Sequence, residues 1–301
     1  MLSIEGVSKS YGEKVAIKDI SFEVPERSTF GLLGPNGAGK TSLIRIINHI
    51  QPADYGSVYF NNQPITEGMV NLIGYLPEER GLYKKMKVGE QVLYLARLKG
   101  MTKAEAVKEI KWWFNRLDIT DWWNKKVETL SKGMQQKVQF IATVLHRPKL
   151  IILDEPFSGF DPVNAEIVKN ELLRLKDEGS TIMLSTHRME SVEELCDHVA
   201  MIHKSEKVLD GRIADVKRQF KNNEFEIKYR GEKLASYPAE ATEVLSESFD
   251  EEHQAQVVKI KMDSDEKSNE VLNHFMAERQ VIGFGEVLPS IEEIFVNIAK
   301  N

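Results

Sequence analysis

The chain has 301 residues, 42% hydrophobic and 29% charged, so it is a globular protein with a substantial core and room for one large and one smaller domain. A single cysteine, Cys196, excludes an internal disulfide and indicates a reducing compartment, and no apolar run approaches the roughly 18 residues needed to cross a bilayer. The net charge of −6 is unevenly distributed along the chain: residues 222–301 carry 17 acidic and 8 basic side chains (net −9), whereas residues 1–221 carry 29 acidic and 32 basic side chains (net +3). The acidic character of residues 222–301 argues against nucleic acid or anionic lipid as a partner of this C-terminal region.

Strand-like and helix-like segments alternate through the first two-thirds of the chain. ISFEV at 20–24 alternates as a half-buried strand does. Short apolar runs predict three fully buried strands, at 30–34, 150–154 and 181–185. A helical pattern follows each of these three, at 40–50, 163–177 and 188–196. This succession is typical of a largely parallel sheet with crossover helices.

Two regions depart from that alternation. Between about 88 and 146 three helical patterns succeed one another without a strand, which predicts an inserted helical subdomain. Beyond Gly211 the pattern becomes strand, strand, helix, strand, helix, which predicts a small α+β domain. The predicted domains are therefore residues 1–215, with the helical subdomain at about 85–146, and residues 216–301.

The segment GPNGAGKT, residues 34–41, matches the phosphate-binding pattern G-x-x-x-x-G-K-[ST] between a predicted strand and a predicted helix. Its glycines allow successive backbone N–H groups to face a bound phosphate. Lys40 would then reach the β and γ phosphates of a nucleotide, and the Thr41 hydroxyl would ligate magnesium. The alternative is a glycine-rich turn with a chance lysine.

The segment LIILDEP, residues 150–156, places two carboxylates at the C-terminal end of a buried strand, where ligands bind in open α/β sheets. Asp154 would hold magnesium through water, and Glu155 would orient the water that attacks the γ-phosphate. Adjacent acids at a strand end can also be merely solvated. The phosphate loop favours the catalytic interpretation.

A second helix start resembles a phosphate site. LSKGMQQK begins at residue 130; Ser131 can cap the helix, whose first N–H groups attract an anion. SGFD at 158–161 and STH at 185–187 follow in order, and Tyr11 precedes the phosphate loop. The guanine motif N/T-K-x-D of GTPases is absent, because NKKV at 124–127 lacks the aspartate.

With these motifs in this order, residues 1 to about 215 resemble the ATP-binding subunits of ABC transporters. The resemblance implies an α/β phosphate-loop domain of ABC type, with ATP and Mg²⁺ as cofactors. Two such subunits meet head to tail, so that Ser131 and Gly133 contact the γ-phosphate bound to Lys40 of the second chain. The implied nucleotide-binding residues are Tyr11, Gly34, Pro35, Asn36, Gly37, Ala38, Gly39, Lys40, Thr41, Ser42, Glu78, Ser131, Gly133 and Asp161.

Particular roles follow from the same resemblance. Tyr11 would stack on adenine, and Asp161 would reach across the interface between the two subunits. His187 would contact the γ-phosphate and help to place Glu155. The implied catalytic residues are Glu155, His187 and Lys40. The implied metal-binding residues are Thr41, Asp154 and Glu78.

Two departures from the family pattern indicate a branch of the family. Glu78 stands where glutamine is usual, and LSKGM replaces LSGGQ, so that Lys132 adds a cation and Met134 removes a polar group. Both departures occur in the Nat-type (sodium-efflux-like) and drug-efflux-like ATPases of ABC-2 exporters. The ending LPSIEEIFVNIAKN also resembles the C-terminal domain of that branch.

The predicted function is ATP hydrolysis that drives a separate membrane permease from the cytoplasmic face of the membrane. The predicted partners are that permease and a second ATP-binding subunit, identical or closely related, with no nucleic acid. Sodium, a drug, a peptide or a lipid all stay open as the substrate. Two alternatives also stay open: an ABC-type ATPase that acts on ribosomes or DNA without a permease, and a regulatory, degenerate half of an asymmetric pair.

All four tryptophans lie in WWFNRLDITDWW, residues 112–123. They either pack the helices of the predicted helical subdomain against one another or form an exposed aromatic rim where a permease docks. The tail domain has no nucleophile or glycine loop. Enlarging the dimer contact, bracing the permease and sensing a ligand are its candidate roles.

Overall fold

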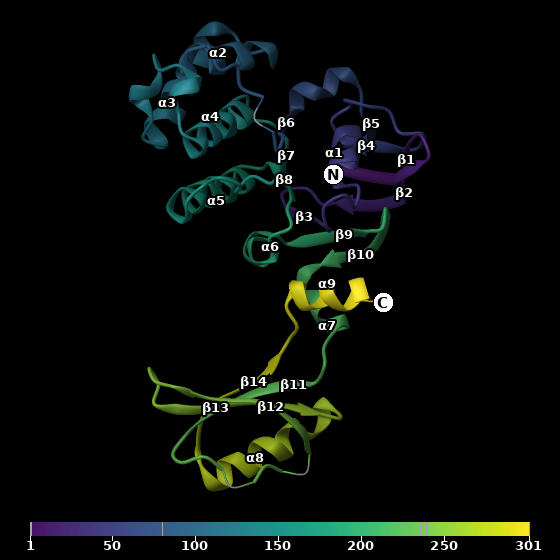
Figure 1. The fold of residues 1–301 in the computed structure, drawn as a ribbon, viewed down its shortest axis with the longest axis vertical. Helices are drawn as coiled ribbons and strands as arrows, with labels where there is room; N and C mark the ends of the chain where they lie inside the picture. The colour runs from purple at the N-terminus through teal and green to yellow at the C-terminus, as the bar shows by residue number, and fades with distance from the viewer. Residues whose placement is uncertain (1, 80, 235, 239, 301) are drawn as a thin grey trace. The chain divides into compact units, whose positions relative to one another are not determined.

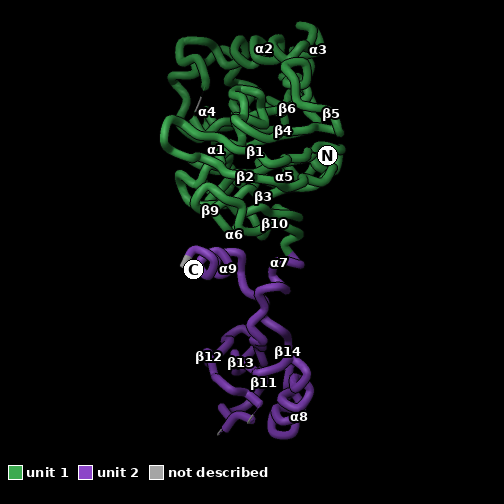
Figure 2. Tube along the Cα trace, turned by 90° about the vertical axis from the view of Figure 1, so that its right-hand side faces the viewer, with its two compact units in different colours: residues 1–213 green, residues 214–301 purple. Residues whose placement is uncertain are grey.

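The computed structural model describes residues 2–79, 81–234, 236–238 and 240–300. The chain forms two compact units, residues 1–213 and residues 214–301, which Figure 2 colours green and purple. The boundary predicted at 215/216 falls within helix α7 (Ile213–Gln219). Each unit has its own hydrophobic core.

Unit 1 is built on a six-stranded, largely parallel sheet, as the alternation of strands and helices predicts (Figure 1). Only the pairing of β10 with β9 is antiparallel among its described strands. In spatial order its strands are β10 (Glu206–Arg212), β9 (His198–His203), β3 (Thr29–Leu33), β8 (Thr181–Ser185), β7 (Leu150–Asp154) and β6 (Ile73–Leu76).

A second, antiparallel sheet packs on the core of unit 1. Its strands, in spatial order, are β2 (Lys14–Val24), β1 (Leu2–Tyr11), β4 (Tyr55–Phe60) and β5 (Gln63–Pro64). Helix α1 (Lys40–Ile47) contributes Leu43 and Ile44 to the same buried cluster as Ile17 of β2 and Leu32 of β3. One core therefore joins both sheets to the helix that follows the phosphate loop.

The chain leaves the parallel sheet after β6 and returns at β7, and the residues between form the predicted helical region (Figure 1). Its helices are α2 (Val88–Leu98), α3 (Lys103–Arg116) and α4 (Lys132–Val144), with the 3₁₀ turns η2 (Thr120–Trp122) and η3 (Val127–Thr129) between them; η1 (Glu67–Leu72) precedes β6. Helices α5 (Pro162–Asp177) and α6 (Met189–Leu195) are the later crossover helices, at the positions predicted.

The tryptophans mainly pack this helical region. Trp113 is buried and meets Phe140 of α4 edge to face, with ring centroids 5.8 Å apart. Trp123 lies against Gly89, where a Cβ would be 2.5 Å from the indole ring. These contacts favour the packing interpretation for Trp113 and Trp123. Trp112 differs, because it is 44% exposed.

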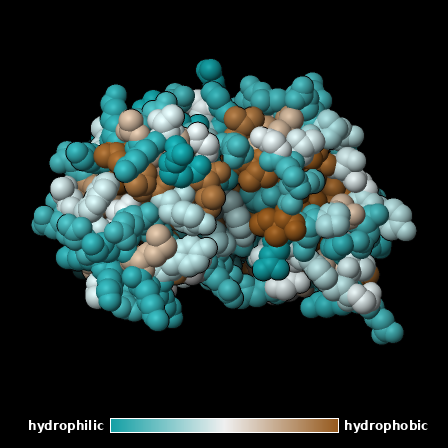
Figure 3. All heavy atoms as spheres, turned by 90° about the horizontal axis from the view of Figure 1, so that it is seen from above, coloured by the Kyte–Doolittle hydropathy of each residue, from teal (hydrophilic) through white to brown (hydrophobic). Residues whose placement is uncertain are grey.

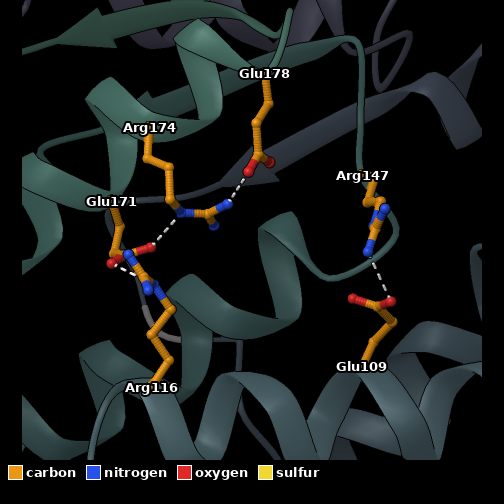
Figure 4. Close-up of polar contacts among 6 residues, drawn as sticks. All are labelled: Glu109, Arg116, Arg147, Glu171, Arg174 and Glu178. Atoms are coloured by element: carbon orange, nitrogen blue, oxygen red, sulfur yellow. Dashed lines mark hydrogen bonds and ion pairs between the residues drawn. The ribbon is translucent and has the colours of Figure 1, made fainter.

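Charged side chains tie α3 to α5 (Figure 4). Glu171 of α5 accepts from Arg116 Nε of α3 at 2.7 Å and from Arg174 Nε at 2.9 Å, and Arg174 also pairs with Glu178. The guanidinium groups of Arg116 and Arg174 lie 5.3 Å and 4.9 Å from the ring centre of Trp112. This cluster fixes the helical region against the sheet-bearing core.

Unit 2 is an antiparallel sheet with a helix on one face, as the α+β pattern predicts. Its strands, in spatial order, are β12 (Ala241–Asp250), β13 (Ala255–Met262), β11 (Glu224–Arg230) and β14 (Gln280–Val287). Helix α8 (Ser268–Glu278), preceded by η4 (Asp265–Lys267), packs Val271 and Phe275 against Ile227 and Val258. Helix α9 (Ile291–Lys300) follows β14. Among the described residues of both units, no helix has the length and apolar character of a membrane span.

Candidate functional site

The phosphate loop between β3 and α1 has a backbone that only glycine permits at two points. Gly34 has φ = 146°, and a Cβ there would lie 2.2 Å from the Ile202 carbonyl oxygen. Gly39 has φ = 114°, and a Cβ there would lie 2.3 Å from the Ala16 carbonyl oxygen. Gly39 is also the N-cap of α1, and it has no side chain with which to occupy the first N–H groups of the helix. These groups are available to an anion.

Lys40, the first residue of α1, folds its ammonium group back over the loop. Its Nζ donates to the Gly34 oxygen at 2.7 Å and to the Pro35 oxygen at 3.2 Å, and the residue is only 7% exposed. Burial lowers the pKa of Lys40, and the negative charges of Glu155 and Asp154 oppose that shift. A buried cation therefore lies between the loop and the two acids at the end of β7.

Asp154, the last residue of β7, faces the start of α1. The Thr41 hydroxyl donates to Asp154 Oδ2 at 3.1 Å, and Asp154 is 2% exposed. Burial raises the pKa of this carboxyl, and the Thr41 bond and the Lys40 charge oppose that rise. Hydroxyl and carboxylate oxygens are the donors that Mg²⁺ prefers, and the exposed Glu78 lines the same cavity. The residues present therefore fit a magnesium ion.

Glu155 is held apart from its neighbour by its backbone. Its φ of 50° lies in the left-handed region, which is strained for a residue with a side chain. The carboxylate accepts from the Thr186 hydroxyl at 3.1 Å and from the His187 backbone N–H at 3.0 Å, and it lies 2.7 Å from His187 Nδ1. Three groups at the end of β8 thus orient the Glu155 carboxylate.

These groups surround one cavity of about 390 Å³, within the size range of small-molecule sites. Tyr11 lines it, and the Tyr11 hydroxyl donates to Gln51 Oε1 at 2.8 Å, which fixes one end of this half-exposed ring. Of the predicted residues, the lining includes Tyr11, Asn36, Gly37, Gly39, Lys40, Thr41, Ser42, Glu78, Asp154 and Glu155. Gly34, Pro35 and Ala38 belong to the loop without lining the cavity, and His187 joins it through Glu155.

Ser131, Gly133 and Asp161 also lie outside the cavity lining, and they form a second cluster. Ser131 caps α4 by accepting from the Met134 N–H at 3.2 Å, and Asp161 caps α5 by accepting from the Asn164 N–H at 3.0 Å. A Cβ on Gly133 would lie 3.1 Å from the Gly159 carbonyl oxygen. The start of α4 therefore lies against the turn that precedes Asp161.

Several residues near the site are not predicted as site residues by any sequence motif considered above. Lys14 and Ala16 of β2 line the cavity, and Thr186 holds Glu155. Gln136 of α4 donates to the Pro156 oxygen at 3.3 Å, and Gln139 donates to the Pro77 oxygen at 3.2 Å. Thr186 lies inside the STH motif and could have been found there. The two buried glutamines carry no signal beyond being polar on the apolar face of a helix.

The family model described as "ABC transporter" matches residues 17–158. The chain is 52% identical over 220 residues to the uncharacterized ABC transporter ATP-binding protein YhaQ of Bacillus subtilis, covering 73% of this chain and 74% of YhaQ. The chain belongs to the ATP-binding subunits of ABC transporters. As such a subunit it is an ATPase coupled to transport, which confirms the predicted family and activity.

Further comparisons agree with this membership and with the predicted branch. A model for the C-terminal domain of ATP-binding proteins like DrrA1-3 matches residues 211–299 of this ABC subunit. NatA of Bacillus subtilis, an ABC transporter ATP-binding protein, is 33% identical over 221 residues, covering 71% of this chain and 90% of NatA. A solved ATP-binding subunit of an ABC transporter superposes with a TM-score of 0.69 at 28% identity, covering 73% of this chain and 93% of that one.

Proposed function

We propose that two copies of this subunit, or one copy and a close paralogue, close head to tail around two molecules of ATP with Mg²⁺. The observation that carries the proposal is the separation of the site into two clusters. Lys40 and Glu155 border one cavity, whereas Ser131, Gly133 and Asp161 lie outside that cavity's lining. A capped helix start with no acidic residue in its first turn suits the γ-phosphate of a nucleotide held by the second chain.

Within each cavity the residues have different roles in phosphoryl transfer. Lys40 and the N–H groups at the start of α1 stabilise negative charge on the phosphates. Thr41, Asp154 and Glu78 would hold magnesium, which neutralises charge on the β and γ oxygens when bound. Glu155, fixed by His187, accepts a hydrogen bond from the attacking water and keeps it in line with the γ-phosphate. Tyr11 stacks on the adenine.

We further propose that this subunit acts in an exporter, at the cytoplasmic face of the membrane, by driving a separate permease that selects the substrate. A groove of about 350 Å³ lined mainly by apolar residues supports a docking site in unit 1. Figure 3, which views the molecule from above Figure 1, shows apolar side chains gathered on part of that face. The lining includes Ile50, Val70, Tyr75, Leu82, Leu95 and Leu98. Residues 1–215 would be the ATPase domain, and residues 216–301 an accessory domain.

The variant Glu155→Gln tests the dimer and the role of Glu155 together. The amide cannot orient the water as the carboxylate does, so we expect hydrolysis to fall at least about 100-fold while ATP binding is kept. The variant should run as a dimer with ATP and as a monomer without it on size-exclusion chromatography. Glu190→Gln, an exposed carboxylate at the start of α6, is the matched control and should behave as the unmodified chain.

Two results would refute this proposal. One is a Glu155→Gln variant that hydrolyses ATP at the unmodified rate. The other is an unmodified chain whose activity per molecule stays constant on dilution to concentrations at which light scattering finds only monomers, because a site shared by two chains must lose activity as they separate.

A further inference from the structure

Strand β12 of unit 2 is a free edge of its sheet. It lies last in the order β12, β13, β11, β14, and it pairs only with β13 among the described strands. All eight residues from 242 to 249 are exposed. One side of the β12 backbone therefore presents N–H and C=O groups that a further extended chain can pair with.

The same strand exposes large apolar side chains. Val244, Leu245 and Phe249 are 38%, 39% and 49% exposed. Proteins protect edge strands with lysine, proline, bulges or a covering loop, and none of the residues of β12 is lysine or proline. The pairing of β12 with β13 shifts between Ala241 and Glu243 and between Val244 and Ser246 but is regular from Ser246 to Asp250, so this regular part of the edge is where a partner can add a strand.

The charge around this edge selects the partner. Residues 234–258 contain six acidic residues and neither lysine nor arginine. Glu247 pairs with Lys233 and Asp250 with His253, whereas the carboxylates of Glu243, Glu251 and Glu252 have no ion pair within the described part of the chain. If the β12 strand of a second copy paired with this edge, the acidic side chains of the two strands would lie close together and repel one another. An anionic lipid surface would also repel these carboxylates.

We propose that the β12 edge binds an extended, basic segment of the membrane permease by adding it to the sheet as a strand. Cytoplasmic segments of membrane proteins carry an excess of lysine and arginine, which complements the net charge of −9 on residues 222–301. Alternate apolar side chains of that segment would lie on Val244, Leu245 and Phe249, and its basic side chains would meet the free carboxylates. This assignment rests on the permease partnership proposed above.

The experiment uses the full chain and labelled peptides as probes: an alternating Lys/Val decapeptide, its Glu/Val analogue, and a Lys/Val peptide with two central prolines. Fluorescence anisotropy at low salt should detect binding of the first peptide only, because glutamate is repelled and proline cannot pair as a strand. The peptide should also slow hydrogen exchange of the β12 amides. The same measurement on vesicles of anionic phospholipid should show no binding.

Matched variants separate charge from apolar contact. Neutralising Glu243, Glu251 and Glu252 to Gln should weaken Lys/Val binding about tenfold, since three partly screened pairs are lost. The control neutralises three exposed acids of η4 and α8, Glu266, Glu270 and Glu278, and should stay within about twofold.

Phe249→Ser should weaken binding about fivefold, and Met276→Ser, an exposed apolar residue of α8, should not. Equal weakening by the two triple variants, binding of the proline peptide, or binding to anionic vesicles would overturn the proposal. ATP binding and hydrolysis are measured on every variant, so a failure of this edge is distinguishable from a failure of the ATPase dimer.

Discussion

Glu171 joins two arginines in the cluster between α3 and α5, and its removal is the sharpest test of how the helical region is held (Figure 4). The perturbation is Glu171→Gln, which keeps the shape of the side chain and removes its charge. The matched control is Glu109→Gln, which breaks the ion pair between Glu109 and Arg147 at 2.9 Å. Both variants remove one carboxylate that contacts an arginine, and in both pairs one member belongs to α3.

The expected magnitudes differ because the two sites differ in burial. The Glu171 side chain is 7% exposed and accepts two charge-assisted bonds, while Arg147 of the control pair is 79% exposed. Breaking a fully buried pair costs about 3–5 kcal/mol, but Arg116 is 40% exposed and regains water, so we expect about 2 kcal/mol for Glu171→Gln. Both members of the control pair are more exposed than their counterparts, with Glu109 at 19% and Arg147 at 79%, so breaking it should cost less than about 1 kcal/mol.

Tryptophan fluorescence during urea unfolding of the full chain is the assay. All four tryptophans lie within residues 112–123, and Trp112 contacts the arginines of the cluster, so the signal reports the helical region. With a slope of about 2.5 kcal/mol/M, Glu171→Gln should lower the urea midpoint by about 0.8 M. Equal shifts for the two variants, or a larger shift for Glu109→Gln, would refute the argument that the Glu171 cluster stabilises this junction.

Two further results are expected. Burial, and then the Lys99 charge, lower the pKa of His146 to about 4, so on acidification the unfolded chain binds a proton before the folded chain does, and the stabilisation that is complete above pH 6.5 is lost as the pH falls from 6.5 towards 4. Chemical unfolding at both pH values should show that His146→Gln loses about 2–3 kcal/mol less stability on acidification than the unmodified chain does. Equal losses in the two chains would contradict this prediction. Gly34→Ala should weaken ATP binding, measured by calorimetry, at least about 100-fold, because the new methyl group meets the Ile202 carbonyl. Gly37→Ala, whose methyl group would enter open space, should weaken ATP binding about tenfold through the positive φ of residue 37 alone. The reverse order of the two effects would show that the loop tolerates a shift at Gly34.

The sequence predicted best what a short stretch encodes locally. The runs at 150–154 and 181–185 are buried strands because apolar residues fill them, with polar residues only at their ends (Asp154, Thr181 and Ser185), and no other periodicity competes. The phosphate loop was predictable because its glycines are required by backbone positions that only glycine occupies well. The helical region was predictable because strand patterns stop at α2 and do not resume until β7.

The sequence could not predict features that depend on distant neighbours. Strand β12 has no buried face, since all residues from 242 to 249 are exposed, and so it lacks the alternation that marks a half-buried strand. Strand β1 carries shifts in its pairing with β2 around Val7 and Lys9, which interrupt its period of two. The hydrogen bonds from Thr186 and His187 to Glu155 form because β7 and β8 lie side by side, and no local sequence pattern encodes that pairing.

Helix α4 connects the two clusters of the candidate site. It begins beside Ser131, its Gln136 contacts the Pro156 oxygen next to Glu155, and its Gln139 contacts the Pro77 oxygen next to Glu78. Both glutamines are buried, so a displacement of α4 that broke these bonds would leave unsatisfied polar groups in the interior. If Ser131 meets the nucleotide of a second chain as proposed, closure at the start of α4 is therefore transmitted through the same rigid helix to the residues beside Glu155 and Glu78. The two ATP sites of the dimer would then be mechanically linked by an element that belongs to neither cavity.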